Sequence, residues 1–154
     1  MRVEIITVGD ELISGDTLDV NSHFAAQRLA ALGLLVTRIT SVGDDYEMVS
    51  EALKKAIETS LYAIITGGLG PTDDDMTNDI VARTLKRPLC LNKAMLDQIK
   101  SVTEMRGIEM TPALEKMAWL PEDSIALNPG GIPGFYIVEK GTRLYFLPGV
   151  PERK

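Results

Sequence analysis

Residues 61–77 have the sequence LYAIITGGLGPTDDDMT, in which an apolar run changes abruptly into a glycine-rich, acidic segment. The first six residues are apolar and partly β-branched, which predicts a buried strand over 61–66. Three glycines and a proline follow, and they interrupt regular structure until about Asn78. A helix is predicted from Asn78 to Lys86, because Pro88 prevents its continuation. A strand, a glycine loop and a helix in this order decide the fold, and the neighbouring segments extend the pattern.

Toward the N-terminus the same alternation occurs twice more. Apolar, β-branched runs predict strands over 2–8 and 35–42. Apolar residues repeated on one face predict helices over 21–32 and 46–59, and Asn21 is expected to cap the first of them. Because strand and helix alternate three times, we predict an α/β fold with a mostly parallel sheet covered by helices on both faces.

The C-terminal half does not continue this regular alternation of strand and helix. Helices are predicted over 93–106 and 112–119, and Cys90, just before them, is expected to be buried. The runs FYIVE at 135–139 and RLYFL at 143–147 predict a hairpin that adds an antiparallel portion to the sheet. The chain shows no internal repeat and no long linker, so we expect a single domain.

The composition of the 154 residues excludes several classes of protein. Hydrophobic residues make up 45% and charged residues 25%, which excludes a disordered chain. A net charge of −6 disfavours binding to nucleic acid or to an anionic membrane surface. The single cysteine excludes an internal disulfide and a multi-thiolate metal site. With no signal peptide and no apolar run of about 18 residues, a cytoplasmic location is expected.

Each of the three N-terminal strands is followed by glycine and acid. The first strand ends in Gly9-Asp10-Glu11 and the second in Gly43-Asp44-Asp45, while the third leads into the glycine loop and residues 73–75, which are all aspartate. Because parallel strands end at the same edge of a sheet, these loops are expected to converge there, where open α/β sheets bind ligands.

The glycine loop predicts an anion site. Gly67, Gly68 and Gly70 would let backbone N–H groups approach a phosphate, and Thr77 would supply a helix cap and a hydroxyl donor. The alternative is a tight turn that binds nothing. Carboxylates repel phosphate unless a divalent cation intervenes, and Asp75 and Asp44 are the first choices to hold one. The alternative for residues 73–75 is that they favour the start of a helix through its dipole.

The segment GGLGPTDDDMT resembles the Gly-Gly-x-Gly-Pro and Asp-x-Thr signature of the molybdopterin-binding MoaB/Mog fold. The stretches at 9–33, 41–53, 117–135 and 147–151 are similar to the N-terminal domain of CinA, the competence/damage-inducible protein. This resemblance implies a three-layer α/β/α domain with its pocket at the glycine loop and a tendency to form homo-oligomers.

The resemblance also implies roles for particular residues. Two aspartates of the family match Asp44 and Asp75, as catalytic residues and as ligands of Mg²⁺, Mn²⁺ or Co²⁺. Asn21, Glu11 and Thr77, with the three loop glycines, would contact the ligand. CinA-type domains imply metal-dependent hydrolysis of the pyrophosphate in nucleotides such as ADP-ribose.

Two alternatives to this hydrolase remain open. The first is a molybdopterin-binding domain in molybdenum cofactor biosynthesis, against which Leu69 counts, since it replaces a threonine common in that branch. The second is a ligand-binding module without catalysis. The family usually continues beyond the Pro-Gly-Val-Pro at 148–151, so we expect one domain over 1–154 and leave open whether its C-terminus is truncated.

Overall fold

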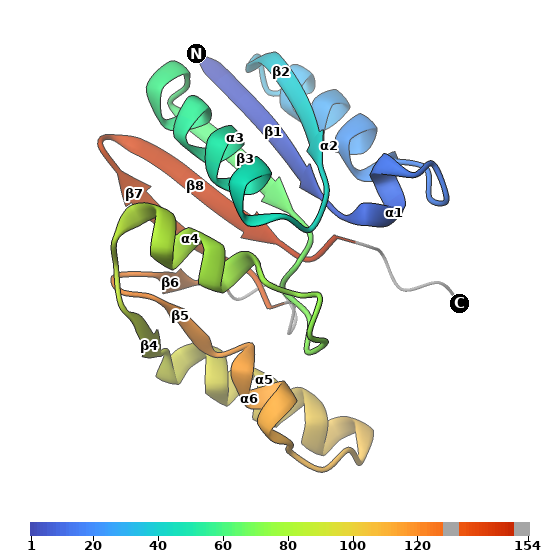
Figure 1. Ribbon diagram of the computed structural model, residues 1–154, viewed down its shortest axis with the longest axis vertical. Helices are drawn as coiled ribbons and strands as arrows, with labels where there is room; N and C mark the ends of the chain where they lie inside the picture. The colour runs from blue at the N-terminus through green and yellow to red at the C-terminus, as the bar shows by residue number, and fades with distance from the viewer. Residues whose placement is uncertain (128–132, 150–154) are drawn as a thin grey trace.

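The computed structural model describes residues 1–127 and 133–149. A six-stranded sheet with the strand order β2-β1-β3-β8-β7-β6 forms the centre of the fold (Figure 1). The first four strands in this order are parallel, and the last two are joined antiparallel. The strands are β1 (Arg2–Val8), β2 (Leu35–Val42), β3 (Tyr62–Thr66), β6 (Ile125–Ala126), β7 (Phe135–Glu139) and β8 (Thr142–Leu147).

The central strand β1 shows why the sheet is covered on both faces. After Arg2, every residue of this strand is buried. Ile6 and Val8 belong to the main hydrophobic cluster, whereas Val3 and Ile5, which point to the opposite face, are buried outside it. Helix α3 (Tyr46–Thr59) lies on the first face and α2 (Val20–Ala31) on the second (Figure 1). The predicted three-layer α/β/α fold with a C-terminal antiparallel hairpin is therefore confirmed.

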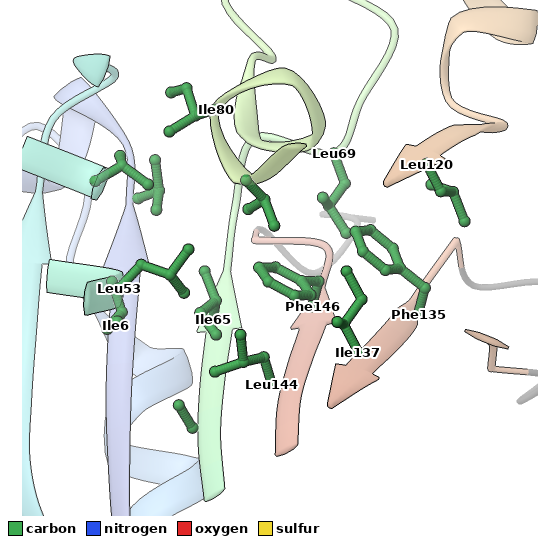
Figure 2. Packing of buried hydrophobic residues seen from close by; sticks show 14 of the residues in the cluster. Ile6, Leu53, Ile65, Leu69, Ile80, Leu120, Phe135, Ile137, Leu144 and Phe146 are labelled. Atoms are coloured by element: carbon green, nitrogen blue, oxygen red, sulfur yellow. The ribbon is translucent and has the colours of Figure 1, made fainter. Parts of the chain in front are cut away.

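The main core lies between the sheet and the helices α3 and α4 (Thr77–Leu85). Phe135 and Phe146 stack with ring centroids 4.7 Å apart, and Ile65, Leu144 and Ile137 pack around them (Figure 2). Leu53 of α3 and Ile80 of α4 belong to the same core, as Figure 2 also shows.

Helices α2 and α4 exist, but the capping residues predicted for them are wrong. Helix α2 begins at Val20, because the side chain of Asp19 accepts a hydrogen bond from the Ser22 N–H and caps the helix in place of Asn21. Helix α4 begins at Thr77, and its N-cap residue is Met76, so Thr77 does not cap it. Helix α3 has the predicted bounds, with Asp45 as its cap.

A smaller lobe beside the main sheet was not predicted. Strands β4 (Leu89–Leu91) and β5 (Trp119–Pro121) pair antiparallel. Helices α5 (Lys93–Arg106) and α6 (Pro112–Lys116) connect them along the chain and lie beside them (Figure 1). Helix α6 is shorter than predicted, because the chain turns into β5. Cys90 on β4 is exposed, so the expectation that it is buried is wrong. None of the described helices has the length and apolar character needed to cross a membrane.

Candidate functional site

The loops that follow β1, β2 and β3 converge on one open pocket of about 1130 Å³, as their sequences predict. The short helix α1 (Asp10–Ile13), the segment 14–21, and Pro148 and Gly149 after β8 complete its wall. Of the residues predicted to form the site, those lining the pocket are Glu11, Asn21, Asp44, Gly67, Gly68, Gly70 and Asp75.

Gly67 occupies a narrow space between the ends of β1 and β8. Its φ of 101° is in the region that favours glycine, and a Cβ atom there would overlap the backbone oxygen of Val8. Its N–H donates to the Leu147 oxygen at 3.0 Å, and a Cβ on Gly149 would come within 2.9 Å of the Gly67 Cα. The protein's own backbone therefore requires glycine at 67.

Thr77 supports the glycine loop from below. It is buried, and its hydroxyl donates to the Gly67 oxygen at 2.9 Å, while its N–H donates to the Gly68 oxygen at 3.1 Å. A Cβ on Gly68 would overlap this hydroxyl, and Gly68 also has a positive φ of 73°. Thr77 is absent from the described pocket wall, so the structure places its hydroxyl against the loop.

Three successive backbone N–H groups of the loop have no partner among the described residues. Within the described part of the chain, those of Gly68, Leu69 and Gly70 have no hydrogen-bond acceptor, and all three residues line the pocket. Leu69 as a whole residue is 4% exposed, and its side chain packs into the core near Phe135 and Phe146 (Figure 2). Leucine at this position therefore anchors the loop through its side chain.

Asp44 and Asp10 exchange hydrogen bonds across the pocket floor. The Asp44 N–H donates to Asp10 Oδ1 at 2.9 Å, and the Asp10 N–H donates to Asp44 Oδ2 at 3.2 Å. Glycine at position 43 leaves room for these hydrogen bonds, because a Cβ atom there would lie 2.6 Å from Asp10 Oδ1. Burial is the main cause that raises the pKa of Asp44, and the charges of Asp10, Glu11 and Asp74 add to it, against the lowering effect of the Asp10 N–H.

Asp75 is held in a tight turn of the loop that follows β3. Its Oδ2 accepts from the Thr72 N–H at 3.1 Å and from the Thr72 hydroxyl at 2.7 Å. Its own N–H donates back to the Thr72 oxygen at 3.1 Å. The second carboxylate oxygen, Oδ1, has no partner among the described residues, so Asp75 is oriented by the turn and retains a free acceptor.

The wall of the pocket is strongly acidic. Its described lining has no lysine, arginine or histidine, and its carboxylates are those of Asp10, Glu11, Asp16, Asp19, Asp44, Asp74 and Asp75. These oxygen donors suit a hard divalent cation, which takes carboxylate and phosphate oxygens. In residues 1–127 and 133–149, no three His, Cys, Asp or Glu side chains form a ready-made metal cluster. A cation such as Mg²⁺ fits one or two of these carboxylates when phosphate completes its coordination.

Sequence reasoning identified the acidic loops but missed two contributors. The sequence assigns Asp10 to a motif but gives it no role of its own. Its hydrogen bonds with Asp44 depend on the parallel pairing of β1 with β2. The segment 14–19 lacked a predicted role, although most of it lines the pocket. Its acidic residues before α2 were the one available signal.

Comparisons with known proteins agree with this architecture. Residues 4–153 match the family model described as a probable molybdopterin binding domain. The chain is 45% identical to Protein PH0439 of Pyrococcus horikoshii over 158 residues, covering 96% of this chain and 62% of that protein. It is 39% identical to a CinA-like protein of Desulfotalea psychrophila, covering 99% of this chain and 37% of that protein. The chain therefore spans less than two thirds of the length of these two curated relatives.

Solved structures show the same relationship. The crystal structure of CinA from Thermoplasma acidophilum is 34% identical, with a TM-score of 0.87 over 97% of this chain and 89% of that one. The molybdopterin biosynthesis enzyme MoaB of Thermus thermophilus is 22% identical with a TM-score of 0.64, over 97% of this chain and 82% of that one, and supports the fold alone. From its match over residues 4–153 and its similarity to CinA, the chain belongs to the probable molybdopterin binding domain family and has the MoaB/Mog-like fold.

Proposed function

We propose that the pocket binds a small nucleotide carrying a diphosphate, of the ADP-ribose class, and that the protein hydrolyses its pyrophosphate with a divalent cation. The row of unpartnered N–H groups at Gly68, Leu69 and Gly70 carries this proposal. Three successive backbone donors at the end of a parallel strand suit phosphate oxygens, and carboxylates that suit a cation line the same pocket.

Asp44 and Asp75 are proposed to hold the cation, which is Mg²⁺, Mn²⁺ or Co²⁺. When bound, such an ion neutralises the charge of the diphosphate and of the surrounding carboxylates, and it polarises the phosphoryl group toward water. Burial is the main cause that raises the pKa of Asp44, and a bound ion would relieve the smaller contribution of the neighbouring negative charges.

The chain's other residues position the substrate. The loop N–H groups hold the diphosphate, while Asn21 and Glu11, which line the same pocket, contact the organic part. Thr77 keeps the loop in place through its hydrogen bond to Gly67. The acidic pocket and the net charge of −6 support a small-molecule partner in place of nucleic acid or a membrane. A cytoplasmic location and a homo-oligomeric state are part of the same proposal.

A second candidate is binding of molybdopterin in molybdenum cofactor biosynthesis. The description of the matched family favours it, and the same N–H groups suit the phosphate of a pterin. The described loop is compatible with both ligands.

Hydrolysis of ADP-ribose to AMP and ribose phosphate, measured with Mg²⁺, Mn²⁺ and Co²⁺ in turn, tests the main proposal. Asp75→Asn is expected to lower the rate by about 100-fold or more, because a catalytic cation contributes several kcal/mol. Asparagine keeps an oxygen that can accept from Thr72, so the turn is retained. Asp73→Asn is the matched control, since Asp73 is exposed in the same loop outside the pocket lining and its loss should leave the rate unchanged.

Three results would overturn the hydrolase. The first is that AMP is not released with any of the metals, and the second is that the Asp75 variant is fully active. The third is saturable binding of ADP-ribose without turnover, which would indicate a binding module. A fluorescence titration with molybdopterin, together with an absence of ADP-ribose binding, would favour the second candidate.

A further inference from the structure

The candidate pocket lacks a positive side chain of its own. Its described lining contains seven carboxylates and no lysine, arginine or histidine. A diphosphate brings further negative charge, and backbone N–H groups supply only partial positive charge to oppose it. A positively charged side chain that opposes this charge therefore has to come from described residues just outside the pocket wall.

Lys116 of helix α6 reaches the rim of the pocket from the smaller lobe. Its Nζ donates to the Thr72 oxygen at 2.5 Å, and Thr72 lines the pocket. The same oxygen accepts from the Asp75 N–H at 3.1 Å, and the Thr72 hydroxyl donates to the Asp75 carboxylate at 2.7 Å. The ammonium group of Lys116 and the backbone N–H of Asp75 thus donate to the same oxygen, and Asp75 is an aspartate proposed to hold the cation.

The backbone of Lys116 is fixed by its neighbours. Thr111 caps α6 by accepting from the Leu114 N–H at 3.2 Å, and Ala118 after the helix is fully buried. The Asn78 side chain of α4 donates to the Trp119 oxygen at 3.3 Å and joins this lobe to the helix that follows the glycine loop. A firmly placed helix therefore delivers a lysine to the rim of the pocket.

The charge of Lys116 is not neutralised within the described part of the protein. The salt bridges of the described residues join Arg83 to Asp79 and Arg87 to Glu139, and Lys116 takes part in neither. Its side chain is exposed, and its partner is a neutral carbonyl oxygen. Lysine has a long and flexible stem, so its ammonium group can turn from Thr72 toward an anion in the pocket.

We propose that Lys116 determines the specificity of the pocket for phosphorylated ligands, by supplying the positive side-chain charge that the described wall lacks. This inference rests on the proposed function, because it names the residue that helps the pocket bind a diphosphate. A purely structural role, in which Lys116 only ties down Thr72, makes different predictions.

Three substitutions separate charge from hydrogen bonding. Lys116→Gln keeps a donor for Thr72 without the charge, Lys116→Arg keeps both, and Lys116→Met removes both. The KM for ADP-ribose is expected to rise about 3- to 30-fold in the Gln and Met variants, the range for one charge several ångströms from another near a surface. The Arg variant should stay within about twofold of wild type. Lys100→Gln, on an exposed position of α5, is the matched control and should have no effect.

The dependence on salt provides a second readout. If the charge acts on the ligand, the affinity of wild type should fall more steeply with NaCl than that of Lys116→Gln, because exposed charges are screened. The proposal is overturned if the Gln variant has the KM and salt dependence of wild type, or if the Arg variant is as weak as the Met variant.

A binding measurement separates this inference from the proposed function. Inorganic pyrophosphate with Mg²⁺, titrated by calorimetry, requires no turnover and no nucleotide. If wild type fails to hydrolyse ADP-ribose but binds pyrophosphate more tightly than Lys116→Gln, the proposed hydrolase fails and the role of Lys116 stands. Equal binding by the two proteins, or no binding by wild type, overturns the role of Lys116.

Discussion

Replacement of Gly67 by alanine is expected to destabilise the fold because the new methyl group meets backbone. The φ of 101° costs an L-residue about 1–2 kcal/mol, and overlap with the Val8 oxygen adds about 1–3 kcal/mol for displaced packing. Alanine also restricts the unfolded chain, which returns about 0.4–1 kcal/mol. The net loss of unfolding free energy is therefore about 2–4 kcal/mol, a large part of the 5–15 kcal/mol typical of a domain.

Urea unfolding of Gly67→Ala and of a control variant tests this number. Gly33 has a φ of 79° and no atom within 4 Å of the added Cβ, so Gly33→Ala experiences the strain without the overlap and should lose about 1 kcal/mol or less. With a urea slope of about 2 kcal/mol per molar, the midpoint for Gly67→Ala should fall by about 1–2 M. Equal midpoints for the two variants would refute the claim that contact with Val8 requires glycine at 67.

Two further predictions concern charge. Arg87 donates to two backbone oxygens and, at 2.6 Å, to Glu139 in a pair about a fifth exposed, so Arg87→Met should cost about 2 kcal/mol in a denaturant titration. Arg83→Met, which breaks an exposed pair with Asp79 and a contact with the Tyr46 ring, should cost about 1 kcal/mol or less, and equal losses would contradict this reasoning. The raised pKa of Asp44 means that the folded state holds its proton more tightly than the unfolded state, so stability falls as pH rises through that pKa. Without divalent cations, Asp44→Asn should therefore raise Tm at pH 7 and leave it nearly unchanged near pH 3, and a lower Tm at pH 7 would contradict the sign.

The parallel half of the fold could be predicted because its signals are local. The strands over 2–8 and 35–42 and the helix over 46–59 each contain enough apolar residues to show their period, and the structure has these bounds. Strands β4 and β5 have three residues each and exist because Leu89 pairs with Pro121, which no local pattern predicts. Such short strands are set by tertiary contacts.

The choice of helix cap shows a second limit of sequence reasoning. Asp19 and Asn21 are both good capping residues, and local propensity does not rank one above the other. The structure uses Asp19, because its two carboxylate oxygens accept from the N–H and the hydroxyl of Ser22. Asn21 is thereby placed in the first turn of α2, on the pocket wall.

The place of the site could be predicted, but its internal contacts could not. Convergence of the three strand-end loops follows from a parallel sheet, and it is confirmed. The exchange between Asp10 and Asp44 joins residues 34 positions apart, and Lys116 reaches Thr72 over 44 positions. These contacts depend on strand register and on how the smaller lobe packs, neither of which the motifs specify.

The glycine signature is weak evidence about the ligand, because the fold itself requires these glycines. Atoms of Val8 and Thr77, which belong to the protein itself, exclude side chains at positions 67 and 68. At position 70, a Cβ atom would lie 2.6 Å from the carboxylate of Asp75. The same glycines would therefore be required for folding in a domain that binds any ligand, or none. Loss of activity in a glycine variant would thus report a damaged loop, whereas Asp75→Asn and Lys116→Gln alter charge and keep the hydrogen bonds to Thr72. For this reason the identity of the ligand has to be tested through the charged residues at the rim of the pocket.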